Sequence, residues 1–450
     1  MSRDTRAEIL VEARGQQLGR RMILRAVAGA AWCLIVTRDA ARGRVPSPVV
    51  TGGDTPVSDF LRMLAFVPAP LDGWQRTISY ANPGLVKERY GLGDVRSYPD
   101  LEARHLSTTE FGSYLGGCWS SPFAYNGLST DGSERDAFGF DFYQVERDLC
   151  AGEPPASLST QTGRDPPTAF GRIEGAFDAA ACAAALQRGG YTAAAYGADP
   201  YFTTLGDGAI DLTNIRSRLF PERRNRLAAD AGRVIATAAT ATMDAALDAE
   251  RGRVPTLDAD PTVRALAGAL GGVTSVATLP PDYADRSIAA ARARSRSSVG
   301  TAQTIARGLR EATGGWGILH PPELLAVAVT DAGGYARTLH LALVYADPVD
   351  AVADAPEIAS RLTGYQVSPS GGGALAAGTD WFAPRTETHA GRGVVVAEAP
   401  LLALPNLNPA WVQSTVESLL PFIALQNPSE TVRRLEADVA TPTPGSTPAP

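Results

Sequence analysis

The sequence predicts an α+β fold of two domains, each a largely antiparallel sheet packed with helices, preceded by an apolar N-terminal helix. The chain has 450 residues, which is more than a single hydrophobic core usually organises. Its hydrophobic content of 44% and charged content of 20% are typical of a globular protein. Strand-like and helix-like segments also recur in both halves of the chain, with turn signals between them.

The clearest unit of the first half spans residues 169–205. The segment FGRIEG alternates like a strand, and Asp178 is a good N-cap for the Ala/Leu-rich run that follows. Gly189 and Gly190 end that helix, and YTAAAYG and PYFTTL then follow as two strands. We expect three side chains of this unit to share one core: Ile173, Leu186 and Tyr191.

The second half has a similar order of elements. ELLAVAVTD and ARTLHLALVYA are apolar strands separated by Ala332, Gly333 and Gly334, which form a hairpin turn. Residues 347–362 are helical in pattern, and GRGVVVAEAP at 391–400 is a buried strand. The weak identity between the halves does not establish whether they are repeats.

These patterns predict five segments. Residues 1–36 form a signal or membrane-anchor segment, and 37–57 form a linker rich in Pro and Gly. Residues 58–265 and 266–432 form the two α+β domains. Residues 433–450, which end in TPTPGSTPAP, form a disordered Pro/Thr tail.

The N-terminal segment determines the expected compartment. Arg20 and Arg21 precede an apolar run at 26–36, which is short for a membrane-spanning helix of about 20 residues but typical of a signal peptide. Arg38 and the arginines after it are unusual directly behind a signal. We therefore expect a secreted or membrane-attached protein, attached through this N-terminal segment, with a cytoplasmic protein as the alternative.

Composition excludes several classes of function. The net charge of −7 argues against nucleic acid as a partner. Lys87 is the only lysine and lies in LVKERY, so the chain has no Walker A loop. The predominance of arginine, with abundant Ala, Gly and Pro, indicates a GC-rich bacterial genome.

The four cysteines contain no Cys-x-x-Cys pair. Cys182 lies in a predicted helix and Cys33 in the N-terminal apolar run. The other two, Cys118 and Cys150, are expected to form a disulfide if the chain is exported and to be free thiols if it is not.

No catalytic, cofactor or metal motif is present. The four histidines lack metal-ligand spacing, and no Gly-x-Ser-x-Gly elbow occurs. We therefore expect no metal and no cofactor. One loop could line a pocket, because a histidine lies near a carboxylate and an indole there. Its candidate residues are His320, Glu323 and Trp316.

Three segments together resemble a loosely defined group of uncharacterised bacterial exported proteins and lipoproteins. They are FLRMLAFVPAP, FGFDFYQVERDLCAGEPP and GRIEGAFD with the YTAAAYGADPYF that follows. The resemblance covers residues 58–280 and implies an extracytoplasmic α+β domain without an assigned activity. It transfers no catalytic residue.

Two hypotheses follow. The first is a noncatalytic extracytoplasmic protein that binds an unknown ligand or an envelope component. The alternative is a secreted hydrolase whose site is assembled from distant residues, around His320 and the glycine-rich segment 368–378.

Overall fold

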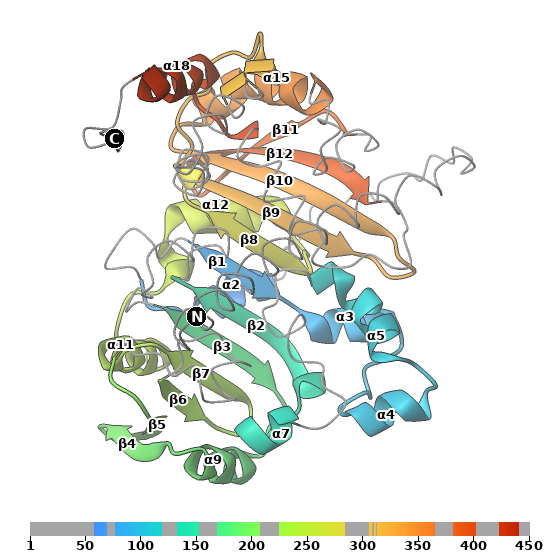
Figure 1. Ribbon diagram of the computed structural model, residues 1–450, viewed down its shortest axis with the longest axis vertical. Coiled ribbons are helices and arrows are strands. Elements are labelled where there is room, and N and C mark those ends of the chain that lie inside the picture. The colour runs from blue at the N-terminus through green and yellow to red at the C-terminus, as the bar shows by residue number, and fades with distance from the viewer. Residues whose placement is uncertain are drawn as a thin grey trace, which may run out of the picture.

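The computed structural model describes most of the chain between residues 58 and 440 (Figure 1). The expected N-terminal helix and the linker at 37–57 lie outside the described residues, as do the glycine-rich segment at 368–378 and residues 441–450. The described ranges are 58–69, 77–118, 133–152, 169–207, 225–283, 306–307, 310–311, 313–364, 381–401 and 423–440.

The described residues form a mixed α/β structure around one large antiparallel sheet. The sheet has twelve strands in the order β11-β12-β10-β9-β8-β1-β2-β3-β7-β6-β5-β4. The strands of the first half are β1 (Ile78–Ala81), β2 (Val145–Ala151), β3 (Phe170–Gly175), β4 (Thr192–Tyr196), β5 (Asp199–Thr203), β6 (Arg226–Ala229) and β7 (Arg233–Thr237). Those of the second half are β8 (Ser275–Leu279), β9 (Leu324–Asp331), β10 (Arg337–Tyr345), β11 (Arg385–His389) and β12 (Arg392–Leu401).

The two halves have the same strand topology. In the first half, β1, β2, β3, β7 and β6 are neighbours in that order, and in the second half β8, β9, β10, β12 and β11 are. Each half therefore places its last strand inside the sheet: β7 lies between β3 and β6, and β12 lies between β10 and β11. A helix follows the third strand in both: α9 (Ala179–Arg188) after β3 and α15 (Pro348–Gly364) after β10. Among the described residues, an additional hairpin, β4–β5, occurs in the first half and has no counterpart in the second.

The halves are joined edge to edge through β1 and β8. Tyr80 of β1 pairs with Val276 of β8, Ser79 pairs with Ala277, and both strands are buried along their length apart from single half-buried positions. Because β1 and β8 are the first strands of their halves and run antiparallel, this pairing relates the halves by an approximate twofold axis.

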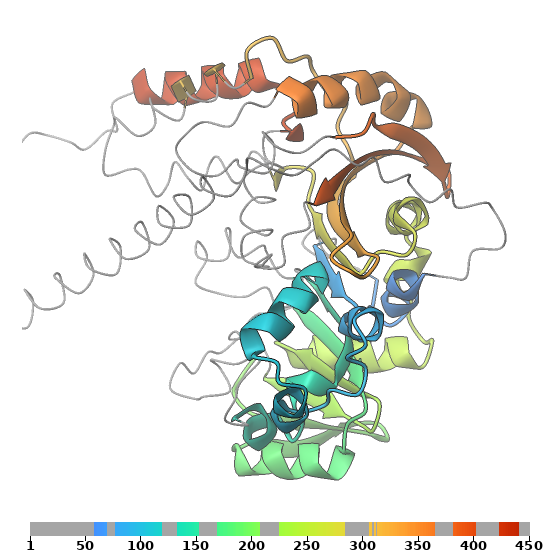
Figure 2. The ribbon, with the colours of Figure 1, turned by 90° about the vertical axis from the view of Figure 1, so that its right-hand side faces the viewer.

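Helices cover both faces of the sheet. We call one face the α12 face, because its core is formed with α2 (Asp59–Leu64), α11 (Thr240–Glu250) and α12 (Pro261–Leu270). The strands of the second half curve around α12 (Figure 2). On the opposite face, α15 packs in the second half and α7 (Ser133–Phe138) with α9 in the first. Between these lie α3 (Pro83–Arg89), α4 (Tyr98–Ala103) and α5 (Thr108–Tyr114).

Several local predictions are confirmed. Residues 169–205 form β3, α9, β4 and β5, and Asp178 caps α9 by accepting from the backbone of Ala180 and Ala181. β9, β10 and β12 lie where the second half was expected to have strands. The alternation of Phe138, Phe140 and Phe142 allows either a strand or a buried aromatic loop, and the structure shows no strand there. They belong instead to a buried aromatic cluster between α7 and β2.

Two boundaries differ from the prediction. The expected division between residues 265 and 266 falls inside α12, which packs under the strands of the second half. The expected start of the tail at 433 is wrong, because residues 433–440 belong to α18 (Pro428–Ala440). Asn427 explains the helix, since its side chain accepts from the Glu430 backbone as an N-cap and Pro428 occupies the first turn.

The predicted core of the 169–205 unit is also confirmed. Ile173, Leu186 and Tyr191 belong to one buried cluster, and Leu186 is 2% exposed. We predict that Leu186→Ala lowers the free energy of unfolding by about 2–5 kcal/mol, because it removes buried methyl groups and leaves a cavity. Urea denaturation measures this change. Gln187→Ala, at the exposed neighbouring position, is the control, and it should change stability by less than about 0.5 kcal/mol.

Candidate ligand-binding pocket

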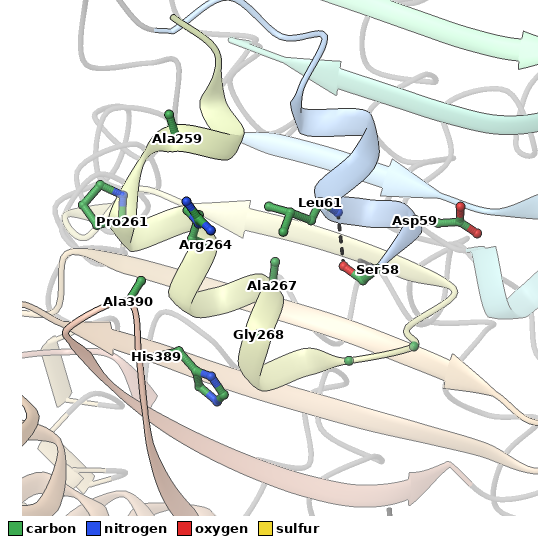
Figure 3. Close-up of a pocket in the computed structure, with 12 residues that line it drawn as sticks. Ser58, Asp59, Leu61, Ala259, Pro261, Arg264, Ala267, Gly268, His389 and Ala390 are labelled. Atoms are coloured by element: carbon green, nitrogen blue, oxygen red, sulfur yellow. Dashed lines mark hydrogen bonds between the residues drawn. The ribbon is translucent and has the colours of Figure 1, made fainter. Parts of the chain in front are cut away.

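A pocket of about 910 Å³ opens on the α12 face, between α2, α12 and the turn that joins β11 to β12 (Figure 3). Its volume is within the range of small-molecule sites. Most lining side chains are small or apolar, with a few polar groups at the margins. The lining residues are Ser58, Asp59, Leu61, Ala259, Pro261, Arg264, Ala267, Gly268, Gly271, Gly272, His389 and Ala390.

Helix α12 is fixed at both ends. Asp260 is its N-cap and accepts from the backbone of Thr262 and Val263, while Pro261 occupies the first turn. At the other end, Gly271 has a positive φ of 60°, which a residue with a side chain rarely adopts. Arg385 of β11 donates to the carbonyl oxygen of Ala269 at 3.0 Å, so a positive charge lies at the helix C-terminus.

His389 reaches the helix because of two glycines. A two-residue turn, Ala390 and Gly391, follows β11, and both residues have positive φ, as a type I′ hairpin requires. The His389 ring lies directly against Gly268 of α12, where a Cβ atom would be 2.8 Å from the His389 Nδ1 (Figure 3). Glycine at 268 therefore permits this contact.

Behind His389, charged side chains form a continuous row across the strands of the second half. His389 Nε2 lies 2.6 Å from Glu387, and Arg385 bridges Glu387 and Glu398 at 2.5 Å each. His340 follows, with its Nδ1 3.2 Å from Glu398. The hydrogen bond with His340, together with the charge of Arg385, lowers the pKa of Glu398. These pairings hold His389 in place at the pocket.

Arg264 is the positively charged residue at the pocket that could pair with a ligand. Its side chain is exposed and, within the part of the chain that the structure describes, makes no hydrogen bond or ion pair. Asp59, at the opposite margin, is already paired with Arg62 and Arg147 and accepts from Asn82. Among the described residues, the pocket thus has Arg264 as a positive charge without an ion-pair partner, beside a surface of small residues.

Asp59 also lines a second, smaller cavity of about 140 Å³ on the first half. Lys87 of α3 lies at this cavity and is 2% exposed. Its Nζ donates to the carbonyl oxygens of Tyr143 at 2.8 Å and Val145 at 3.2 Å. Burial lowers the pKa of Lys87 to about 8. The only lysine of the chain therefore ties α3 to the start of β2.

The three candidates from the sequence are not brought together. His320 lies beside α15, where its Nδ1 is 2.8 Å from Asp354 and its Nε2 is 3.7 Å from Asp350. The hydrogen bond with Asp354 raises the pKa of His320. Trp316 packs nearby, with the Arg361 guanidinium 5.0 Å from its ring. Neither of the two cavities described above is lined by any of these candidates.

Glu323 points to the other side of the sheet. Its carboxylate accepts from Thr262 of α12 at 2.7 Å and from Arg392 of β12 at 2.8 Å. Glu323 therefore attaches the N-terminus of α12 to the sheet and has a structural role. Its neighbours in the sequence gave no indication of this role, because both partners are more than 60 positions away.

The disulfide between Cys118 and Cys150 is not formed. Both residues are buried and neither is in a disulfide, and the same holds for Cys182 in α9. Cys150 pairs with Ser79 in the middle of the sheet, whereas the Cys118 Sγ lies 4.0 Å from the carbonyl oxygen of Thr274. Burial raises the pKa of the Cys118 thiol, so the reactive thiolate is disfavoured.

The pocket was missed at the sequence level because its residues come from three distant segments, near 60, 265 and 390. Among the described residues, no three His, Cys, Asp or Glu side chains gather as metal ligands would. No described helix has the length and apolar character needed to cross a membrane. Comparison with protein-family models, curated proteins and solved structures gave no match.

The position of Lys87 predicts a specific pH dependence. Its folded pKa of about 8 lies below the ordinary value of 10.5, so the folded state binds fewer protons between these values. The contribution of Lys87 to stability should therefore rise as the pH increases from about 8 to 10.5. Lys87→Met removes this amine and leaves the other titratable groups of the chain in place.

Urea denaturation of both proteins across this range tests the prediction. The free energy of unfolding of the wild type should increase relative to that of Lys87→Met as the pH rises. If the difference in the free energy of unfolding between the two proteins stays constant with pH, the lowered pKa of the buried Lys87 amine is contradicted.

Proposed function

We propose that the protein is a noncatalytic binding protein whose pocket between α2 and α12 holds a small amphipathic molecule with an acidic group. The observation that carries the proposal is the pocket of about 910 Å³ with the exposed Arg264 at its margin, which has no ion-pair partner in the described part of the chain. An acid of the ligand would pair with Arg264, and its apolar part would lie over Ala267, Gly268 and Gly272.

The pairing of the other polar groups at the pocket supports ligand binding rather than catalysis. His389 is held by Glu387, and Asp59 is shared between arginines. Within the described ranges, neither is paired with a hydroxyl or thiol that it could activate. Polar groups arranged in this way can orient a ligand without reacting with it.

The alternative of a hydrolase has one observation in its favour, the hydrogen bond between His320 and the buried Asp354. A histidine that activates a nucleophile needs one ring nitrogen directed at a hydroxyl or thiol. Both ring nitrogens of His320 instead lie near carboxylates, those of Asp354 and Asp350. This arrangement favours an ion pair between His320 and the N-terminal part of α15 over a catalytic dyad.

We further propose that the protein acts outside the cytoplasm, as a member of the exported group that it resembles. The support is in the sequence: Arg20 and Arg21 precede an apolar run of signal-peptide length. The two halves, with their common strand topology, would then be two extracytoplasmic α+β domains behind an apolar N-terminal helix. A ligand of the cell envelope would fit such a location.

Binding can be tested with anilinonaphthalene sulfonate, an anionic amphiphile whose fluorescence rises in apolar sites. We predict that Arg264→Glu weakens its binding about tenfold or more, because a charge-assisted contact is replaced by repulsion. Gly272→Phe should abolish binding. A Cβ at Gly272 meets no atom within 4 Å and φ there is not positive, so the new ring can enter the pocket without strain.

Two control variants lie outside the pocket. Arg188→Glu makes the same charge change at an exposed site in α9, and Gly206→Phe adds the same ring at a glycine with equally open surroundings. Both should bind like the wild type. Unchanged affinity in both Arg264→Glu and Gly272→Phe would refute the proposed site.

The location is tested in a bacterium with a twin-arginine export pathway. We predict that replacing Arg20 and Arg21 by lysine retains the protein in the cytoplasm, because that pathway reads the arginine pair. Cell fractionation with N-terminal sequencing measures the outcome. Wild-type protein found only in the cytoplasm would contradict the extracytoplasmic location.

A further inference from the structure

The two ends of the sheet differ in how they are protected. The strand at one end, β11, carries Arg385, Glu387 and His389 and follows Pro384. Charges and proline are the usual devices that prevent an edge strand from pairing with another chain. The strand at the other end, β4, has the sequence TAAAY, without a charged residue or proline.

No described segment lies beside the other side of β4 in the sheet. In the sheet β4 pairs only with β5, and residues 192–196 make no hydrogen bond on their other side with any segment that the structure describes. Three of its five residues are exposed: Thr192, Ala193 and Ala195. An exposed, uncharged edge of this kind is suited to strand addition.

The hairpin fixes which backbone groups face outward. Tyr196 and Asp199 flank a two-residue turn and form a hydrogen-bonded pair, and such pairs alternate along antiparallel strands. Ala194 therefore bonds inward to Tyr201, whereas the N–H and C=O groups of Ala193 and Ala195 point away from the sheet. Proline at 200, opposite Ala195, is consistent with this alternation.

We propose that β4 is a dimerisation edge, at which a second copy of this chain pairs antiparallel with the first to continue the sheet. The outward groups set the register: Ala193 pairs with Ala195 of the second copy, and the two Ala194 residues meet at the twofold axis. At each end, Thr192 lies opposite Tyr196 of the other copy, which is a favourable pair of β-branched and aromatic residues.

The surrounding charges permit this pairing. Asp199 is bound by Arg251, and Asp248 is bound by Arg253 and by the Tyr196 hydroxyl. Because these charges are neutralised within one chain, they do not repel a second copy. The chain also contains a precedent, since β1 and β8 join its two halves by the same edge-to-edge antiparallel pairing.

A cysteine at the axis tests both the dimer and its register. In a full-length chain with Cys33→Ser, Ala194→Cys should give a disulfide-linked dimer under mild oxidation. Directly opposed residues of a non-hydrogen-bonded pair have Cα atoms about 4.5 Å apart, within disulfide range. Ala193→Cys lies opposite Ala195 and should not cross-link. Thr386→Cys, on the exposed part of β11, controls for random collision.

Self-association without cross-linking is measured by sedimentation velocity over a concentration series. Ala195→Pro removes one outward N–H from each copy and should weaken the dimer about tenfold or more. Ala193→Lys places an exposed charge at the interface and should do the same if the proline variant is misfolded. Circular dichroism verifies the fold.

A wild-type chain that stays monomeric at all concentrations would overturn the proposal. A dimer that survives both substitutions and gives no Ala194→Cys cross-link would also overturn it, because the copies would then meet elsewhere. The anilinonaphthalene sulfonate measurement is independent of this outcome, since the pocket lies on α12 and the proposed edge lies at the far end of the sheet.

Discussion

The antiparallel pairing of β1 with β8 is the contact on which the rest of the structure depends. It joins two units of the same topology into one sheet and places their preceding helices, α2 and α12, on the same face. The main core runs across this junction and includes Tyr80 of the first half and Val276 of the second. Without this pairing, β1 and β8 would be exposed, and each half would lose the core contacts that it makes with the other.

The pocket is a consequence of this junction. Two helices that meet over a pseudo-twofold axis leave a groove unless large side chains fill it, and α12 has Ala267 and Gly268 there. The second half closes the groove from one side because its strands curve around α12 and bring His389 to Gly268. The site thus belongs to the junction between the halves and to neither half alone.

The sequence predicts those features that depend on neighbours in the chain. The cap at Asp178, the hairpin between β9 and β10 and the shared core of Ile173 and Leu186 all follow from local patterns. The pocket, the role of Glu323 and the surroundings of Cys118 do not follow from local patterns. They depend on contacts between segments that are far apart in the chain. Cys150 lies on β2 opposite Ser79, and the Cys118 Sγ lies next to the carbonyl oxygen of Thr274, a contact across 156 positions that no local pattern reveals.

The additional hairpin β4–β5 explains why the edges of the sheet are unequal. By topology, β6 of the first half corresponds to β11 of the second, and β11 ends the sheet with charged side chains. In the first half, β5 and β4 pair onto β6, so the free edge moves from a strand that contains the buried Arg226 to TAAAY. If the β4–β5 hairpin served only to cover β6, an outer strand without charged residues would bring no advantage. Pairing with the β4 strand of a second copy therefore explains the uncharged edge better than the stability of a single chain does.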